Sequence, residues 1–398
     1  YGSDSFISLL EIVTMGNHAN DLIQAYNELS SDAQKAFLNT ALLHRFKLGM
    51  PVSWLKNSIA SSWEDFTEKV IKAEGKGILI QHFQKSRGLE PDIFFKTKHP
   101  IIAERLIQIL LKDRDLQFKY YLKIFRTVTV GKVNSFLISN LLKAFVKEES
   151  FSQAKIDKLF DEAYGRLSDD PFYCLNYAIN LQYRDSIPEL KKALSILVYA
   201  ESLLDYRNHR FTHRRGVLNF ELAKRYYKKE SNGLNFTISY LNEAKELFKL
   251  KQLLDPFSHY SYISYISLLI WELENVEYEL STELKKRIQI EELFDIALRT
   301  VTDEISQVYS LQNKYAKYLS QVSATNDYKQ YIDELYENVE VRPYACILLF
   351  NHYEKQLGRD SQECYDKVIE MKSYMDNNEV VKFLFKYYGR ELYNSDSR

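Results

Sequence analysis

Glycine and proline are scarce along this chain, and their scarcity sets the strongest limit on its fold. Only 12 glycines and 7 prolines occur among 398 residues, whereas tyrosine (30) and phenylalanine (23) are abundant. Since glycine and proline interrupt regular structure, few of them over this length favour long helices with short connections. We therefore predict a mostly α-helical protein, long enough for two or three domains.

One short motif repeats in the part of the chain where helical spacing dominates, from about residue 131 onward. Asp170-Pro171-Phe172 recurs as Asp255-Pro256-Phe257 and, more weakly, as Arg342-Pro343-Tyr344. The prolines are 85 residues (256 − 171) and 87 residues (343 − 256) apart, a little over twice the roughly 34-residue period of a tetratricopeptide (TPR) unit. Each interval is therefore expected to hold two irregular helical hairpins.

The segment 213–256 fits such a hairpin best. Its first helix would carry Gly216, Phe220 and Ala223, and its second helix would carry Ala244 and Phe248 before Pro256 ends it. A small residue is expected where two helices touch, and an aromatic residue four positions on fills the adjacent core. We predict that residues 131–398 form an irregular TPR-like α-solenoid, whose stacked hairpins create a long binding surface.

Residues 1–130 show a different pattern, which we interpret as a winged-helix-like domain. The run Ser30-Ser31-Asp32 is expected to cap one helix, and Ser61 or Ser62 can cap another. Gly49-Met50-Pro51 is interpreted as a break in the chain. The expected elements are helices at 33–46, 52–59 and 62–71 and strands at 78–80 and 93–95. Three helices followed by two short strands are typical of a winged helix.

The junction after the last of these strands is the first candidate binding site. Pro100 suits the first turn of a helix, and Lys96, Lys98 and His99 lie directly before it. Unpaired N–H groups and cations at a helix start favour a phosphate group. The alternative is that His99 only satisfies neighbouring backbone groups.

A dense basic run is the second candidate site. It contains two histidines four residues apart, His209 and His213, together with Arg207, Arg210, Arg214 and Arg215. The arginines could bind an anion or an acidic partner at a hairpin joint. The alternative is an exposed loop whose cations pair with nearby glutamates. We favour a solvated basic turn over a metal site for the histidines, because four adjacent cations would repel a metal ion.

No catalytic motif is present in the sequence. Gly75-Lys76-Gly77 and Gly131-Lys132-Val133 lack the second glycine spacing and the hydroxyl of a P-loop, and HExxH, CxxC and GxSxG are absent. We therefore expect that this chain is not an enzyme and binds no cofactor or metal ion by itself.

The charge balance and the cysteine content indicate which classes of partner the protein can bind and which cellular compartment it occupies. A balance of 53 basic and 54 acidic residues, a net of −1, argues against a nucleic-acid partner, so any basic site must be local. Cys174, Cys346 and Cys364 are few and scattered, which favours a reducing cytoplasm and inert packing. No apolar run is long enough to span a membrane. Because the chain begins Tyr1-Gly2, we expect it to be part of a longer protein.

Two tyrosine clusters could stack ligands, but we expect them in the solenoid core. The clusters are Tyr260, Tyr262 and Tyr265, and Tyr387 and Tyr388. Aromatic residues at helical spacing more often pack inward with only the hydroxyl near water.

Residues 20–110 resemble the segment that follows the ATPase core in bacterial STAND NTPases (signal-transduction ATPases with numerous domains). The resemblance lies in Tyr26-x-x-Leu29, Ala33-Gln34-Lys35-Ala36, Ala41-Leu42-Leu43-His44-Arg45-Phe46, Trp63-x-x-Phe66 and Lys96-Thr97-Lys98-His99-Pro100-Ile101-Ile102-Ala103-Glu104. Family members often have arginines where this chain has Lys96 and Lys98. A winged helix followed by a TPR-like solenoid is also the order found in that family.

The resemblance implies a ligand-sensing, regulatory role in antiviral defence. An upstream NTPase with ATP or ADP and Mg²⁺ would belong to the full-length protein, and His99 would contact a nucleotide phosphate in the resting state. The solenoid would recognise a protein trigger, for example a phage protein, and release the NTPase and effector, with homo-oligomerisation on activation. The alternative is a constitutive protein–protein interaction scaffold.

A transcription regulator ranks lowest among the functions that we consider. The predicted third helix carries Glu64, Asp65 and Glu68 against Lys69. A helix that reads DNA faces phosphates and should be more basic than this one.

Overall fold

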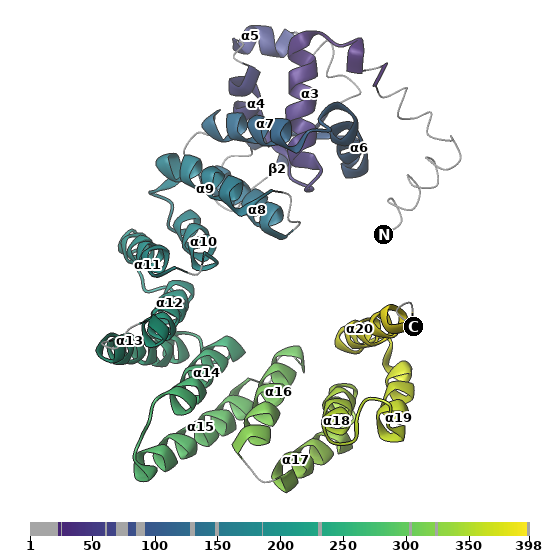
Figure 1. Cartoon of the computed structure of the whole chain (residues 1–398). Coiled ribbons are helices and arrows are strands. Elements are labelled where there is room, and N and C mark those ends of the chain that lie inside the picture. The colour runs from purple at the N-terminus through teal and green to yellow at the C-terminus, as the bar shows by residue number, and fades with distance from the viewer. Residues whose placement is uncertain are drawn as a thin grey trace. The chain divides into compact units, whose positions relative to one another are not determined.

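The computed structural model describes residues 23–24, 26–59, 62–68, 79–84, 92–127, 132–147, 151–184, 186–229, 233–301, 305–322 and 325–395. Helices dominate these residues, so the expected mostly α fold is confirmed (Figure 1). The chain divides into two compact units, residues 1–206 and 207–398, which are described separately below. The boundary expected near residue 130 stays a prediction. None of the described helices is long and apolar enough to cross a membrane.

The first unit begins with the winged-helix-like arrangement. Its elements are α3 (Ser31–His44), β1 (Met50–Pro51), α4 (Val52–Ile59), α5 (Trp63–Phe66), β2 (Leu79–Gln84) and β3 (Asp92–Thr97). Ser30, from the expected capping run, caps α3, and Ser62 rather than the alternative Ser61 caps α5. Their hydroxyls accept the N–H groups of Ala33 and Asp65. The expected third helix beyond Glu68 and the start of the first strand at Ile78 lie outside the described residues.

The three strands form an antiparallel sheet in the order β1-β3-β2. The interpretation of 49–51 as a simple break was wrong, because Met50 pairs with Phe95 and Pro51 with Phe94. A two-residue edge strand that contains proline gives no alternating pattern to detect. β2 also continues to Gln84, beyond the expected apolar run, because exposed strand positions such as Gln81 and His82 carry polar side chains.

Helices complete the first unit. They are α6 (Pro100–Leu110), α7 (Arg114–Thr127), α8 (Lys132–Lys147), α9 (Gln153–Leu167), α10 (Pro171–Gln182) and α11 (Ile187–Ser202). Tyr121, Phe145 and Phe151 pack edge to face between α7, α8 and the start of α9, with ring centroids 4.7–5.8 Å apart. Their contacts join the winged-helix-like part to the helices that follow it.

The second unit is a run of helical pairs. Its elements are α12 (His209–Lys229), α13 (Gly233–Leu254), α14 (His259–Asn275), α15 (Leu280–Thr300), α16 (Ile305–Val322), α17 (Thr325–Glu337), α18 (Arg342–Leu357), α19 (Gln362–Met371), the 3₁₀ helix η2 (Lys372–Tyr374) and α20 (Asn378–Ser395). Each interval between the repeated prolines holds two contacting pairs, α10/α11 and α12/α13, then α14/α15 and α16/α17. The predicted number of hairpins per interval is therefore confirmed.

The first helix of each pair also contacts the first helix of the next pair. α12 contacts α14, α14 contacts α16, α16 contacts α18, and α18 contacts α20. We call these five helices the first-helix layer. Such stacking is the geometry of a helical-repeat protein, in which each hairpin buries an apolar face that it cannot bury alone.

Gly216 sets the distance between α12 and α13. A Cβ atom at this position would lie 2.6 Å from Cε1 and 2.8 Å from Cδ1 of Phe248. The Phe248 ring therefore lies against the backbone of α12, and Ala223 and Ala244 are buried in the same core. The expected small residue Ala244 and the aromatic residue four positions on, Phe248, are both in the core, whereas the contact of Phe248 with Gly216 was not predicted.

A buried carboxylate joins α13, α14 and α15. Glu272 of α14 accepts from Lys245 at 2.7 Å, from the Tyr278 hydroxyl at 2.6 Å and from Lys286 at 3.0 Å. Burial alone would raise the pKa of the Glu272 carboxyl, but the bonds from these donors outweigh it and hold that pKa below its ordinary value. Three successive helices are therefore held in register by one charged group.

Replacing Gly216 with alanine tests the close contact with Phe248. We expect the free energy of unfolding of the variant to be about 1–3 kcal/mol lower than that of the wild type, because the added methyl group overlaps the Phe248 ring. Gly389→Ala in α20 is the control, since its Cβ meets nothing within 4 Å, and it should be neutral or stabilising by about 0.5–1 kcal/mol. Urea unfolding followed by circular dichroism measures both, and equal shifts would contradict the close contact.

Replacing the buried Glu272 with glutamine should lower the free energy of unfolding by about 3–5 kcal/mol, because two partly buried lysines lose their counter-charge. Folding lowers the pKa of Glu272 from its ordinary value of 4.5. The stabilisation that its carboxylate gives is therefore present above about pH 4.5 and is lost as the pH falls through the pKa of the folded state. Wild type should therefore lose more stability than the variant in acid. Glu379→Gln, which breaks an exposed pair with Lys382, should cost less than about 1 kcal/mol.

Candidate functional site

The first candidate site lies where β3 meets α6, and its histidine caps the helix. His99 has an extended backbone, and its Nδ1 accepts the N–H of Ile101 at 3.2 Å. Pro100 occupies the first helical turn as expected. The alternative role considered for His99, satisfaction of nearby backbone, is therefore present in the structure. Because Nδ1 accepts, a neutral ring carries its proton on Nε2.

A buried polar chain fixes the backbone of this junction. Thr97 donates its hydroxyl proton to the carbonyl of His99 at 3.0 Å, so the Nδ1 of buried His44, 2.7 Å from the same hydroxyl, must donate to it. Burial, with the charges of Lys96 and His99 nearby, lowers the pKa of His44 to about 4. His44 is therefore neutral at physiological pH and serves as a fixed donor.

Cations border the same junction. Lys98 is exposed and Lys96 half-buried, and both lie a few residues before the start of α6 in the chain. Arg45 ties α6 to α3 through Glu104, with Nε–Oε2 at 2.6 Å and Nη2–Oε1 at 3.1 Å. The junction can therefore present Lys96, Lys98 and the His99 ring to an anion while its backbone stays fixed. Binding of a nucleotide phosphate there stays a prediction.

The basic run is helical rather than a loop, which corrects one of the alternatives considered. α12 begins at His209, so Arg210, Arg214 and Arg215 lie in its first turns and only Arg207 precedes it. The Nη2 atom of Arg215 lies 3.7 Å from Glu243 of α13. Successive residues are about 100° apart around a helix, so Arg215 does not share the face of Arg210. The four arginines therefore do not form one cluster.

His209 belongs to a charged group between α12 and α13. Its Nδ1 lies 2.8 Å from Oδ2 of Asp255, which also pairs with Lys251. Asp170, the matching residue of the repeated motif, instead caps α10 by accepting the N–H of Tyr173 at 2.7 Å. The repeated Asp-Pro dipeptide thus has two different structural roles.

His213 lies in a separate, more apolar setting. Its ring is 6.0 Å from that of Phe248 and 6.3 Å from that of Tyr260. Burial, together with the neighbouring charge of Arg214, lowers the pKa of His213 to about 4. Among the described residues, no group of three or more His, Cys, Asp or Glu side chains could hold a metal ion.

Five cations line one side of α12, and we call them the basic ridge. They are Arg210, Arg214, Lys224, Arg225 and Lys228. Glu221 lies among them, paired with Lys224 and 3.7 Å from Arg225. The basic run predicted as a site ends at Arg215, whereas α12 as a whole contains seven lysines and arginines against one glutamate. The excess of lysine and arginine over the whole of α12 was the signal in the sequence that could have indicated the basic ridge.

The tyrosine expectation is correct for two residues of its first cluster and wrong for the third. Tyr262 and Tyr265 are buried in the core of the second unit, whereas Tyr260 is 59% exposed beside His213. In the other cluster Tyr387 packs against the C-terminal core and Tyr388 is 40% exposed. Spacing alone did not show which side of α14 is covered.

The cysteines are packing residues, as expected. Cys174, Cys346 and Cys364 are free and buried. Burial raises the pKa of the Cys174 and Cys346 thiols to about 12. A thiol with such a pKa supplies almost no thiolate near neutral pH, so neither is a nucleophile.

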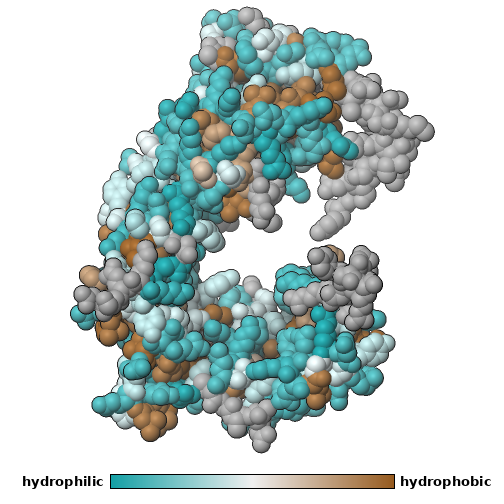
Figure 2. Space-filling model, in the orientation of Figure 1, coloured by the Kyte–Doolittle hydropathy of each residue, from teal (hydrophilic) through white to brown (hydrophobic). Residues whose placement is uncertain are grey.

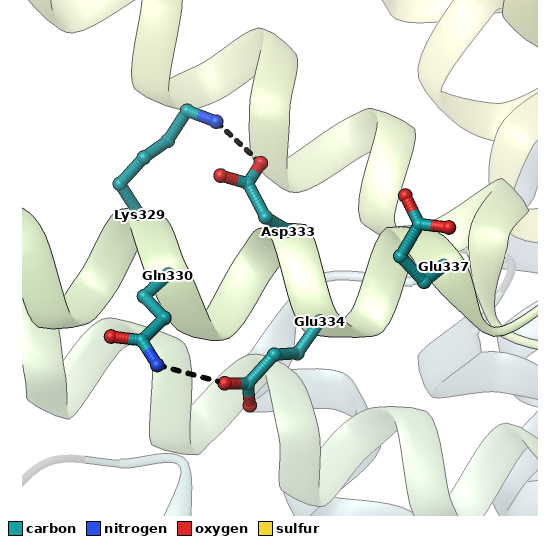
Figure 3. A pocket seen from close by; sticks show the side chains of 5 residues that line it. All are labelled: Lys329, Gln330, Asp333, Glu334 and Glu337. Atoms are coloured by element: carbon teal, nitrogen blue, oxygen red, sulfur yellow. Dashed lines mark hydrogen bonds and ion pairs between the residues drawn. The ribbon is translucent and has the colours of Figure 1, made fainter.

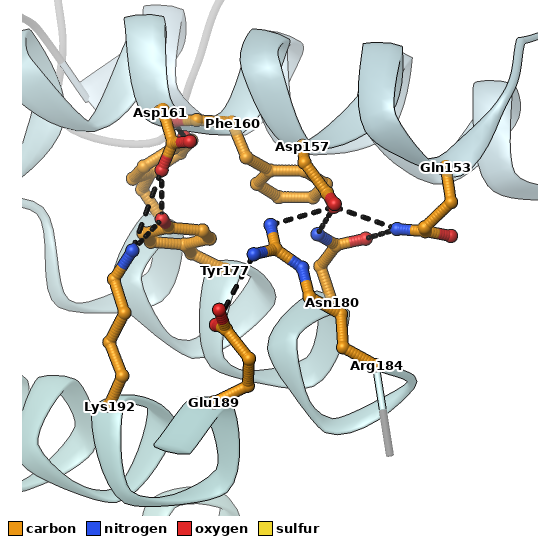
Figure 4. Close-up of polar contacts among 10 residues, drawn as sticks. Gln153, Asp157, Phe160, Asp161, Tyr177, Asn180, Arg184, Glu189 and Lys192 are labelled. Carbon is orange, nitrogen blue, oxygen red and sulfur yellow. Dashed lines mark hydrogen bonds and ion pairs between the residues drawn. The ribbon is translucent and has the colours of Figure 1, made fainter. Parts of the chain in front are cut away.

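A polar network in the first unit has a structural role. Figure 4 shows side chains from α9, α10 and α11 meeting around Arg184. Arg184 pairs with Asp157 at 2.7 Å and Glu189 at 3.2 Å, and Asn180 donates to Asp157 at 2.9 Å. These charges pair with one another and hold three helices together.

A shallow acidic depression on α17 is open surface. Figure 3 shows its lining side chains, all from one helix: Lys329, Gln330, Asp333, Glu334 and Glu337. Lys329 pairs with Asp333 and Gln330 donates to Glu334 along that helix. The depression encloses no ligand-sized cavity.

α15 is apolar on two sides. Ile290, Phe294 and Ala297 lie in the core, whereas Leu280 and Leu284 are 81% and 57% exposed. Figure 2 shows hydrophobic surface in the lower-left region, where α13, α14 and α15 lie. The second unit therefore exposes apolar side chains outside the first-helix layer as well.

Replacing His99 tests its capping role. His99→Ala should lower the free energy of unfolding by about 1 kcal/mol, because the Ile101 N–H loses its acceptor. Asparagine is a good N-cap, so His99→Asn should retain most of that stability. Thermal unfolding measures both variants, and equal losses would contradict a capping role.

Comparison with known proteins gives little similarity. No protein-family model and no curated protein sequence matches the chain. The solved structure of the human IFIT1 dimer with m7Gppp-AAAA is 14% identical over 74% of this chain and 62% of that chain, with a TM-score of 0.44. The human IFIT1 dimer with PPP-AAAA is 12% identical over 94% and 92%, with a TM-score of 0.29. The first alignment thus spans less than two thirds of IFIT1, and no function is inferred from either.

Proposed function

We propose that this chain is the ligand-sensing, regulatory half of a STAND-type signalling or defence protein of the cytoplasm. Its helical repeats recognise a protein trigger, and the chain binds rather than catalyses. The observation that carries the proposal is the first-helix layer, in which five helices contact one another in sequence. A layer of this kind presents side chains from several repeats on one extended surface.

The junction between β3 and α6 is the proposed link to a nucleotide switch. His99, Lys96 and Lys98 lie together and are the donor types that bind phosphate. In the full-length protein they would contact ATP or ADP bound with Mg²⁺ to an NTPase domain. Trigger binding releases that contact only if the trigger binds the open state more tightly than the closed one. Released NTPase and effector domains would then form a homo-oligomer.

A constitutive scaffold is the second candidate. The same layer could hold host proteins permanently, because stacked hairpins do not require a nucleotide switch. The two functions differ in the preceding part of the full-length protein: a Gly-x4-Gly-Lys-Ser/Thr motif upstream favours the switch, and its absence favours the scaffold.

Pairwise binding measurements test the proposal. Individually purified phage proteins should include at least one that binds the immobilised chain, while uninfected host proteins do not. Tyr260→Ala on α14 should weaken that binding about tenfold, because exposed tyrosines often anchor interfaces. Leu284→Ala on α15 is the matched control: it is 57% exposed against 59% for Tyr260, and binding should change less than about twofold.

The proposal is wrong if no phage protein binds in this screen. Binding to host proteins alone would support the scaffold instead. Equal loss in both variants would place the contact outside the first-helix layer.

A further inference from the structure

We infer that the basic ridge of α12, together with the exposed aromatic rings beside it, binds an acidic segment of a protein partner. The inference rests on the proposed protein-binding function and specifies the chemistry of the partner. α12 has seven lysines and arginines against one glutamate, a net of +6, whereas the whole chain has a net charge of −1. Positive charge is therefore concentrated on one helix of the first-helix layer.

The spacing of the ridge residues places their charges along one side of the helix. Positions 210, 214, 221, 225 and 228 are separated by three, four or seven residues, so they recur on the same face. From Arg210 to Lys228 the helix rises about 27 Å, 18 residues at about 1.5 Å each. Arg210 and Lys228 are exposed at its two ends. Glu221 is the one acidic residue that α12 itself contributes, so the helix carries an excess of cations.

The opposite side of α12 is used for packing, so the cations cannot turn inward. Gly216 lies against Phe248 of α13, and Phe220 and Ala223 are in the core. Lys224 lies over the Phe220 ring, with its Nζ 4.4 Å from the ring centroid. Packing on this side fixes the backbone of α12, so the spacing of the ridge residues along the helix is already set before a partner binds.

Aromatic rings border the ridge. Tyr260 is 59% exposed, and Tyr227 is 39% exposed. The Tyr227 ring meets Trp271 edge-on at 5.5 Å, and Trp271 meets Phe220 edge-on at 5.8 Å. Such held rings offer an apolar contact at low entropic cost, and tyrosine, tryptophan and arginine are enriched where proteins bind proteins. An acidic segment with an apolar side chain fits both features.

The charge outside the ridge favours a protein segment over a nucleic acid. α14 carries Glu272 and Glu274 and no lysine or arginine, and α17 has four acidic residues against Lys329. Nucleic-acid affinity depends on the summed positive field over many phosphates. A net charge of −1 gives no such field, whereas a short acidic segment needs only the ridge.

Fluorescence anisotropy with the full chain tests the inference. The probe is a labelled 15-residue peptide of repeating Glu-Glu-Leu, compared with a Gln-Gln-Leu peptide and a 15-nucleotide single-stranded RNA. We expect the acidic peptide to bind most tightly, with affinity that falls as salt rises. Arg210→Glu combined with Lys228→Glu should weaken it at least about tenfold, and Arg210→Gln with Lys228→Gln should weaken it less, as expected for a charge effect.

The matched control reverses two exposed cations on second helices of the pairs. Lys249 of α13 and Arg299 of α15 have side chains 51% and 78% exposed, and Lys249→Glu with Arg299→Glu should change peptide affinity less than about twofold. Circular dichroism confirms that each variant is folded. Equal loss in ridge and control variants, no peptide binding at millimolar concentration, or tighter RNA binding would each overturn the inference.

Failure of this inference is distinguishable from failure of the proposed function. A phage protein that binds wild type and the Arg210→Glu, Lys228→Glu variant equally would overturn the ridge as its site and leave protein recognition intact. Loss of that binding in the ridge variant alone would support both.

Discussion

The second unit depends on one constraint: no helical pair can bury its apolar faces without the next pair. The contact of Gly216 with Phe248 shows how closely the first pair must approach. With a side chain at position 216, α13 would have to move away, and Ala223 and Ala244 would lose their close packing in the core that α12 and α13 share with α14. The spacing of the repeats, and with it the first-helix layer, follows from such contacts between neighbouring helices.

Packing between neighbouring helices also decides which charged side chains of the second unit are buried and which stay at the surface. The buried carboxylate of Glu272 is neutralised by Lys245 of α13 and Lys286 of α15 and also accepts from the Tyr278 hydroxyl in the connection before α15, so it fixes the register of α13, α14 and α15. α12 itself contributes a single carboxylate, Glu221, against seven lysines and arginines, and burying an unpaired cation would cost several kcal/mol. They must stay at the surface, where a basic ridge can serve recognition. The acidic residue Glu272 of α14 is therefore buried in the core, whereas the basic residues of α12 stay at the surface.

The junction before α6 combines structural and functional demands on one residue. His99 caps the helix through Nδ1, and the carbonyl of the same residue accepts the Thr97 hydroxyl. Buried His44 completes the chain and holds the backbone in place. The position of the His99 ring and the backbone of the junction are therefore held by contacts within the first unit itself.

The sequence by itself determined the helical class, the helix starts near Ser30 and near Ser61 or Ser62, and the hairpin at 213–256, because periodicity and small residues act locally along the chain. Only the tertiary structure decided that Met50 pairs with a distant strand and that Tyr260 faces solvent while its neighbours are buried. Spacing tells which residues share one face of a helix, whereas helices and strands far away in the sequence decide which face is covered.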